Sequence, residues 1–190
     1  MNYSECIENA RTRIGNYCKA CPECNGRACK NQMPGPGAKG IGDTAIRNYD
    51  KWKEIRVQMD TIAENKPVDT SLELFGKKFL YPFFAGPVGA VGLHYGDCLD
   101  DVRYNDILVS ACAKYGIAAF TGDGLDSNVM VAATKAIGKT DGIGIPTVKP
   151  WNIDTVAEKM KMVQESKAFA VAMDVDAAGL PFLKNMEPPA

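Results

Sequence analysis

The chain has 190 residues, of which 46% are hydrophobic and 24% charged, and its 22 basic and 23 acidic residues leave a net charge of −1. These proportions are typical of a globular protein with a sizeable core, and the balanced charge argues against binding to nucleic acid or to an anionic membrane. Because no apolar run approaches the ~20 residues of a membrane helix and no basic-then-apolar leader begins the chain, we expect a cytoplasmic protein.

Residues 1–43 form a polar, cysteine-rich segment, and we expect residues 44–190 to form the body of the protein. Ser4 is an expected N-cap for a short helix over residues 4–16, and a loop rich in glycine and proline ends the segment. Four of the seven cysteines fall within CKACPECNGRAC, residues 18–29. In a cytoplasmic protein an odd number of cysteines favours thiols or metal ligands over disulfides.

The four clustered cysteines follow the spacing C-x₂-C-x₂-C-x₄-C: Cys18, Cys21, Cys24 and Cys29. This spacing is close to the ferredoxin pattern without matching it, and zinc sites usually set two C-x₂-C pairs further apart. Thiolates so near in sequence can meet on one ion only where the loop curls tightly, which Pro22 and Gly26 permit. Three interpretations stay open, a convergent zinc or iron–sulfur site, reduced thiols in a tight loop, and, after these two, disulfides among the four cysteines.

The next segment contains a helical pattern followed by a hairpin. Apolar residues in TAIRNYDKWKEIRVQMDTI recur near helical spacing, which predicts a helix from residue 44 to about residue 62. In SLELFGKKFLYPF, two short apolar runs flank Gly76 and Lys77, which predicts a β-hairpin with its turn at this position.

From residue 81 onward, strand-like and helix-like segments alternate. The apolar runs YPFFAGP, IAAFTGDG, GIGIPTVKP and AFAVAMDVDAAG are separated by the helical patterns DDVRYNDILVSACAKYG, SNVMVAATKAIGK and DTVAEKMKMVQES. Ser127 is an expected cap for the second helix, and Asn152 or Asp154 for the third. This alternation predicts βαβ units on a parallel sheet. Four units are visible, so the fold is an open α/β sheet or the front half of a (β/α)₈ barrel.

Several of these stretches resemble the FMN-dependent α-hydroxy-acid oxidase/dehydrogenase family, and more closely a clostridial-type branch called α-hydroxy-acid oxidizing protein. They are IRNYDKWKEIRVQMDTI, FGKKFLYPFFAGPVGAVGLHYGD, GIAAFTGDG, GIPTVKPW and AVAMDVDAAG. The resemblance implies a (β/α)₈ TIM barrel with an N-terminal helical segment, a hairpin across the barrel bottom, and FMN at the carboxyl ends of the strands. It also implies oxidation of a small α-hydroxy acid by hydride transfer to the flavin.

The resemblance assigns six residues to the flavin site: Gly86, Pro87, Val88, Gly89, Thr121 and Lys149. It places Met173 or Asp174 at the exit of the fourth strand, whereas Asp176 is equally well explained as a helix N-cap. Asp123 and Asp126 are interpreted as turn and cap residues. His94, the single histidine, is interpreted as a structural or rim residue and not as the catalytic base.

The chain also departs from the family. The loop KNQMPGPGAKG lacks the tyrosine that the family uses to bind substrate. The family's catalytic histidine, substrate-binding arginines and phosphate-binding loops come from the second half of the barrel. We therefore expect an incomplete chain with weak FMN affinity, one that forms homo-oligomers or associates with the missing half. The alternatives are an inactive half-barrel and a metal or iron–sulfur protein built on an α/β scaffold.

Overall fold

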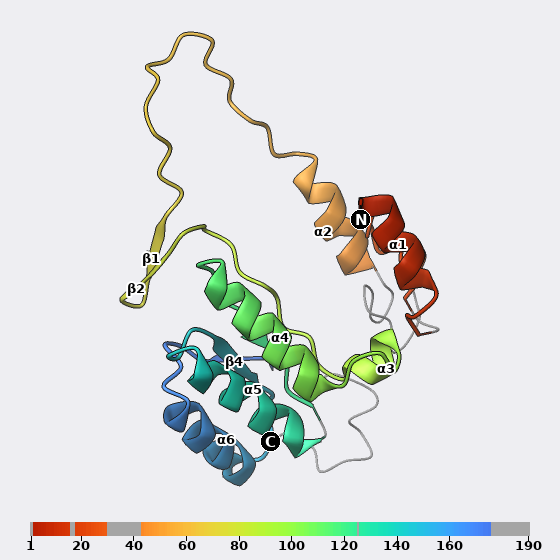
Figure 1. Ribbon diagram of the computed structural model, residues 1–190, viewed down its shortest axis with the longest axis vertical. Coiled ribbons are helices and arrows are strands. Elements are labelled where there is room, and N and C mark those ends of the chain that lie inside the picture. The colour runs from red at the N-terminus through yellow and green to blue at the C-terminus, as the bar shows by residue number, and fades with distance from the viewer. Residues whose placement is uncertain (1, 16–17, 30–42, 125, 176–190) are drawn as a thin grey trace. The chain divides into compact units, whose positions relative to one another are not determined.

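The computed structural model describes residues 2–15, 18–29, 43–124 and 126–175 (Figure 1). The chain divides into two compact units, one formed by residues 1–68 and 91–100 and the other by residues 69–90 and 101–190. Within the described residues, no helix has the length and apolar character needed to cross a membrane.

The first unit contains α1 (Tyr3–Arg11), α2 (Asp43–Trp52) and α3 (Val91–Tyr95). A capping box begins α1, because the Asn2 side chain accepts a hydrogen bond from the Glu5 amide at 2.9 Å and the Glu5 carboxylate accepts one from the Asn2 amide at 2.9 Å. The N-cap is therefore Asn2, and the prediction of Ser4 was wrong. The helix also ends earlier than expected, at Arg11.

The helix predicted to reach residue 62 ends at Trp52. Beyond it Ile55, Val57 and Met59 alternate with polar residues and are 64%, 88% and 87% exposed. A period of two does not gather apolar side chains on one helical face, and helices in proteins depend mainly on packing such a face. The local spacing of residues 46–57 suggested a longer helix than this pattern can stabilise.

The second unit begins with the predicted hairpin, which the structure confirms, although its turn lies at Phe75 and Gly76, one residue earlier than predicted, because Lys77 already belongs to the second strand. Strands β1 (Leu72–Leu74) and β2 (Lys77–Phe79) pair antiparallel. The two turn residues, Phe75 and Gly76, have φ angles of 50° and 75°, as a two-residue turn that follows the twist of the strands requires.

Three parallel strands form the sheet of this unit: β3 (Phe120–Thr121), β4 (Ile145–Val148) and β5 (Ala172–Met173). Their spatial order is β3-β4-β5, and Ala85 forms a parallel bridge to Ala119 that adds an earlier segment of the chain beside β3. The helices α4 (Asp101–Lys114), α5 (Ser127–Lys139) and α6 (Ile153–Glu165) connect these segments in turn. Neighbours in the sheet are thus neighbours in the chain.

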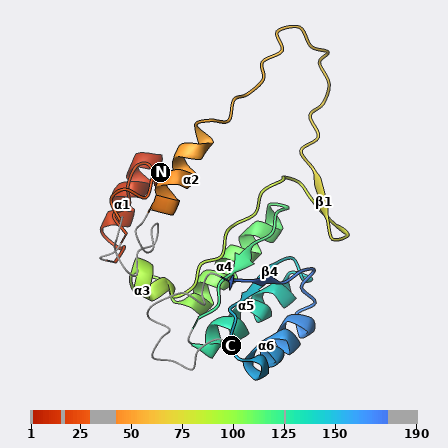
Figure 2. The same ribbon diagram turned by 180° about the vertical axis from the view of Figure 1, so that it is seen from behind.

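The three connecting helices cover one face of the sheet. Ala119 packs against Val109 of α4 and Ile137 of α5, and Val148 packs against Met130 of α5 and Val163 of α6. Figures 1 and 2 show α4, α5 and α6 side by side, with β4 along one side of this layer.

Strand order and helix placement are the features in which the two predicted architectures differ. A doubly wound sheet reverses its strand order at a switch point and carries helices on both faces, whereas a barrel keeps chain order and has helices outside only. The observed order β3-β4-β5, with its helices on one face, is consistent with part of a (β/α) barrel, and one βαβαβ half of a doubly wound sheet has the same arrangement.

The helix starts follow side-chain capping. The Asp126 carboxylate accepts a hydrogen bond from the Asn128 amide at 2.9 Å and is the N-cap of α5, so the prediction of Ser127 was wrong while the interpretation of Asp126 as a cap is confirmed. Asn152, one of two candidates for α6, accepts a hydrogen bond from the Thr155 amide at 2.9 Å and caps that helix.

Two glycine-containing loops at the carboxyl ends of the strands lie against each other. A Cβ atom at Gly122 would lie 2.3 Å from the Val88 carbonyl oxygen, and one at Gly89 would lie 2.9 Å from the Asp123 carbonyl oxygen. Real Cβ atoms do not approach backbone this closely, so only glycine fits at Gly122. The GPVG loop after the first strand segment is therefore packed backbone to backbone against the TGDG loop after β3.

This packing makes Gly122→Ala strongly destabilising. We expect the substitution to lower the free energy of unfolding by about 2 kcal/mol, the usual cost of forcing extra volume into a filled space. Gly124→Ala is the matched control, because its new Cβ would lie 3.8 Å from Val129 Cγ2, an ordinary contact. Chemical denaturation measures both. Equal stability of the two variants would contradict the backbone-to-backbone contact.

Candidate active site

Polar side chains gather where the parallel strands end. Asp123 follows β3 by two residues, Lys149 directly follows β4, and Asp174 directly follows β5. Because parallel strands present their carboxyl ends at the same edge of a sheet, these residues lie at one end of the second unit, the end at which barrel enzymes build their active sites.

The Asp123 carboxylate accepts four hydrogen bonds at this end of the sheet. Its Oδ1 accepts hydrogen bonds from Lys159 Nζ at 2.6 Å and from the Gly124 amide at 2.9 Å. Its Oδ2 accepts hydrogen bonds from Trp151 Nε1 at 2.7 Å and from the Lys149 amide at 3.0 Å. The Asp123 side chain is fully buried and that of Lys159 is 8% exposed. A buried ion pair is tolerated only with such additional hydrogen bonds, because both charges have left water.

Lys159 makes a second contact that completes this arrangement. Its Nζ lies 5.6 Å from the centre of the Trp151 ring, within the range of a cation–π interaction. Lys159 belongs to α6 and Trp151 to the loop after β4. One carboxylate therefore connects the exits of two strands to the helix that covers them.

Lys149 and Asp174 form the accessible charged pair of the strand ends. Lys149 Nζ lies 3.0 Å from Asp174 Oδ2, and the two side chains are 15% and 32% exposed. The Asp174 amide also donates to the Val148 carbonyl at 2.9 Å, which keeps β5 in register with β4 up to this pair. The site thus presents a cation and a hydrogen-bond acceptor side by side at its surface.

Two threonine hydroxyls in the strands are buried without hydrogen-bond partners among the described residues: Thr121 Oγ1 and Thr147 Oγ1. Thr121 is paired with Pro146, and paired residues of parallel strands point to the same face of the sheet. Pro146 and Val148, two residues apart, share that face, which is the one packed against the helices. Side chains alternate along a strand, and Thr147 therefore lies on the opposite face of the sheet. Lys149 would lie on this same face if the strand continued to it.

This geometry separates the two threonines. Thr121 shares the carboxyl end of the sheet with Lys149 but lies on the helix-covered face, and a contact between Thr121 and the flavin stays a prediction. Thr147 was missed from sequence, although its place two residues before Lys149 in IPTVK is the signal that could have identified it.

The loop formed by Gly86, Pro87, Val88 and Gly89 offers backbone to a ligand. A Cβ atom at Gly86 would meet nothing within 4 Å, and both Gly86 and Pro87 are exposed. Val88 and Gly89, by contrast, are held against Gly122 and Asp123. The loop is thus fixed at one end and open at the other, which suits the approach of a flat ring to its backbone.

The remaining predicted residues lie elsewhere. His94 belongs to α3 in the first unit, where its ring packs edge-on against Tyr95 with 6.1 Å between centroids. Met173 is the last residue of β5 and is 49% exposed. Asp176 lies outside the described residues.

The cysteine loop is a connector between two helices of the first unit. Tyr3 of α1 donates a hydrogen bond from its hydroxyl to the Pro22 carbonyl at 2.6 Å, the Tyr49 hydroxyl of α2 donates to Glu23, and Arg27 pairs with Asp50 of α2 at 3.2 Å. These contacts attach the loop to α1 and α2.

The four thiols of this loop are free and lie close enough to influence one another. Burial raises the pKa of the Cys24 thiol, and the negative charges of Cys29, Cys18 and Cys21 raise it further. Among the described residues, however, no three histidine, cysteine, aspartate or glutamate side chains are arranged to hold a metal ion. Of the interpretations left open by the spacing, the structure therefore does not support the convergent zinc or iron–sulfur site.

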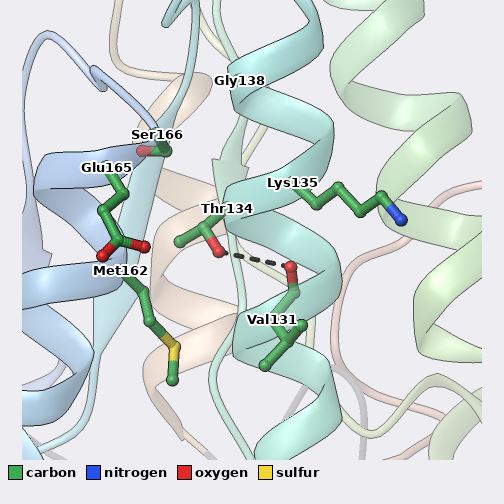
Figure 3. A pocket seen from close by; sticks show the side chains of 7 residues that line it. All are labelled: Val131, Thr134, Lys135, Gly138, Met162, Glu165 and Ser166. Atoms are coloured by element: carbon green, nitrogen blue, oxygen red, sulfur yellow. Dashed lines mark hydrogen bonds between the residues drawn. The ribbon is translucent and has the colours of Figure 1, made fainter.

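A groove of about 400 Å³ lies between α5 and α6 (Figure 3). Thr134 lines this groove, but its hydroxyl already donates to the Met130 and Val131 carbonyls of its own helix at 2.9 and 3.2 Å. Figure 3 shows Lys135 pointing away from Glu165 across the helix. Because no polar side chains converge here, the groove is a gap between neighbouring helices and not a second candidate for chemistry.

Comparison with known proteins agrees with the α/β architecture. Residues 35–184 match the family model described as FMN-dependent dehydrogenase. The chain belongs to the FMN-dependent dehydrogenase family, whose members are TIM-barrel oxidoreductases that use FMN. No match was found among curated proteins.

Removing the charge of Asp123 tests how strongly the buried pair holds the strand ends. Asp123→Asn preserves the shape of the side chain but leaves Lys159 without an opposite charge, so we expect a loss of about 3 kcal/mol in the free energy of unfolding. Asp106→Asn is the control, because Asp106 and Lys139 also lie 2.6 Å apart but are 50% and 56% exposed; its loss should stay below about 1 kcal/mol. Similar losses in thermal unfolding would refute the distinction.

The acid–base behaviour of Cys24 tests how close the four thiols are. Replacing Cys18, Cys21 and Cys29 by serine removes three negative neighbours, so the pKa of Cys24 should fall while remaining above its usual value because of burial. The pH profile of Cys24 alkylation, resolved by peptide mass spectrometry, should shift to lower pH. Cys6, an exposed thiol on α1, serves as the reference and should keep its profile. An unmoved Cys24 profile would mean that the thiols lie further apart.

Proposed function

We propose that this protein oxidises a small α-hydroxy acid, with FMN bound at the carboxyl ends of the parallel strands. The observation that carries the proposal is the Lys149–Asp174 pair at 3.0 Å, only partly exposed, at the exits of β4 and β5. Membership of the FMN-dependent dehydrogenase family supports the flavin chemistry.

The residues at the strand ends fit a flavin. Gly86 leaves room beside the backbone for a flat ring, and the buried Thr147 hydroxyl has no partner among the described residues. A buried hydroxyl without a partner costs free energy, so a ligand that bonds Thr147 would recover that cost. The Lys149 ammonium is a suitable partner for an electron-rich edge of the ring. When bound, FMN supplies the capacity to accept a hydride.

The charged pair also fits the substrate class. An α-hydroxy acid carries an anionic carboxylate next to a hydroxyl that can donate a hydrogen bond. The Lys149 ammonium matches the first group, and the Asp174 carboxylate, which accepts hydrogen bonds when ionised, matches the second. Charge-assisted hydrogen bonds of this kind are about twice as strong as neutral ones. The pair would therefore bind the substrate and orient its hydroxyl-bearing carbon.

Titration with FMN, followed by flavin fluorescence, tests the proposal. Lys149→Met should weaken FMN binding about tenfold, because a hydrogen bond to a charged group contributes on the order of 1.5 kcal/mol. Lys135→Met is the matched control, since Lys135 is an exposed lysine on α5 that points away from Glu165, and it should bind FMN like the unmodified chain. An unmodified chain that shows no saturable binding, or equal affinities for both variants, would contradict the proposed site.

A further inference from the structure

Lys149 owes its position to a residue that bonds its backbone amide and not its charged Nζ. Its side chain reaches Asp174, but its backbone amide is bonded to Asp123 Oδ2 at 3.0 Å. Pro150 follows Lys149 and cannot donate a hydrogen bond, so the next donor along the chain is Trp151, whose indole also bonds Asp123 Oδ2 at 2.7 Å. Both anchors of the Lys149–Trp151 turn are thus on one oxygen.

The two oxygens of Asp123 make different contacts. Oδ1 bonds Lys159 of α6 and the Gly124 amide, and these contacts attach the helix to the β3 exit. Among the described residues, the donors to Oδ2 both belong to the turn after β4: the Lys149 amide and Trp151 Nε1. The attachment of the helix and the placement of Lys149 can therefore be separated by mutation.

We propose that Asp123, through Oδ2, is the positioning residue of the Lys149–Asp174 pair and sets the place at which this pair meets an anionic ligand. The inference rests on the proposed function for the nature of that ligand, but the positioning itself can be measured without any ligand. Asp123 is buried and does not reach the ligand, so its effect is exerted through the backbone of Lys149.

Amine labelling resolved by peptide mass spectrometry reports the position of Lys149. An ammonium that is ion-paired and 15% exposed reacts slowly with an acylating reagent. Lys139, whose side chain is 56% exposed, is the internal reference, and its rate should be the same in every variant. Circular dichroism at the labelling temperature confirms that each variant is folded.

Two variants that differ only at Asp123 give the decisive comparison. Lys159→Met removes the Oδ1 partner but leaves the Oδ2 contacts, and we expect Lys149 to be labelled within twofold of its rate in the unmodified chain. The double variant Asp123→Ala with Lys159→Met removes the carboxylate without leaving a buried, unpaired lysine, which guards against unfolding. In this variant we expect labelling of Lys149 to accelerate at least fivefold. Equal Lys149 rates in the two variants, or a fivefold acceleration in Lys159→Met alone, would overturn the proposal.

The same measurement in the presence of FMN separates this inference from the proposed function. Bound FMN should slow the labelling of Lys149 at least threefold in the Lys159→Met variant, and this protection should be lost in the double variant. A lack of protection in the unmodified chain would overturn the proposed function while leaving the positioning result intact. Protection of equal size in both variants would overturn the role of Asp123 toward the ligand.

Discussion

The carboxyl end of this sheet depends on one buried anion. An ionised carboxylate away from water is costly unless charged and hydrogen-bonding partners surround it, and Asp123 has four donors from the β3 exit, the β4 exit and α6. Further along the strands, the same elements are joined by apolar packing around Val148 and Ile137. The sheet is therefore held by hydrophobic contacts along its length and by a polar network where ligands would approach.

This division explains what could be predicted from sequence. The helices α4, α5 and α6 and the hairpin could be predicted because their signals are local, namely apolar periodicity and a turn glycine, whereas the predicted cap residue of α5 was wrong by one position. Asp123 was interpreted only as a turn residue. Its partners Trp151 and Lys159 lie 28 and 36 residues further along the chain, and a pairing over such separations leaves no local pattern.

The other differences between prediction and structure concern the direction in which side chains point, which the order of residues along the chain does not specify. Thr121 and Thr147 both precede a strand exit, but the register between β3 and β4 places them on opposite faces, and register is not readable from one strand alone. The spacing of the cysteines describes distance along the chain and not the direction of the thiols. In the structure the loop is held by Tyr3, Tyr49 and Arg27, which lie outside the local spacing of the cysteines.

The strand order has a consequence for how the chain folds. Each strand pairs with the one before it in sequence, from Ala85 and Ala119 through β3 and β4 to β5, so every pairing closes a loop of similar length. The entropic cost of closure grows with loop length, and here it is divided among several short closures instead of one long closure. Because chains emerge from the ribosome from the N-terminus, each strand can add to an edge that already exists when it is synthesised. The sheet can therefore grow during translation by adding its strands in their order along the chain.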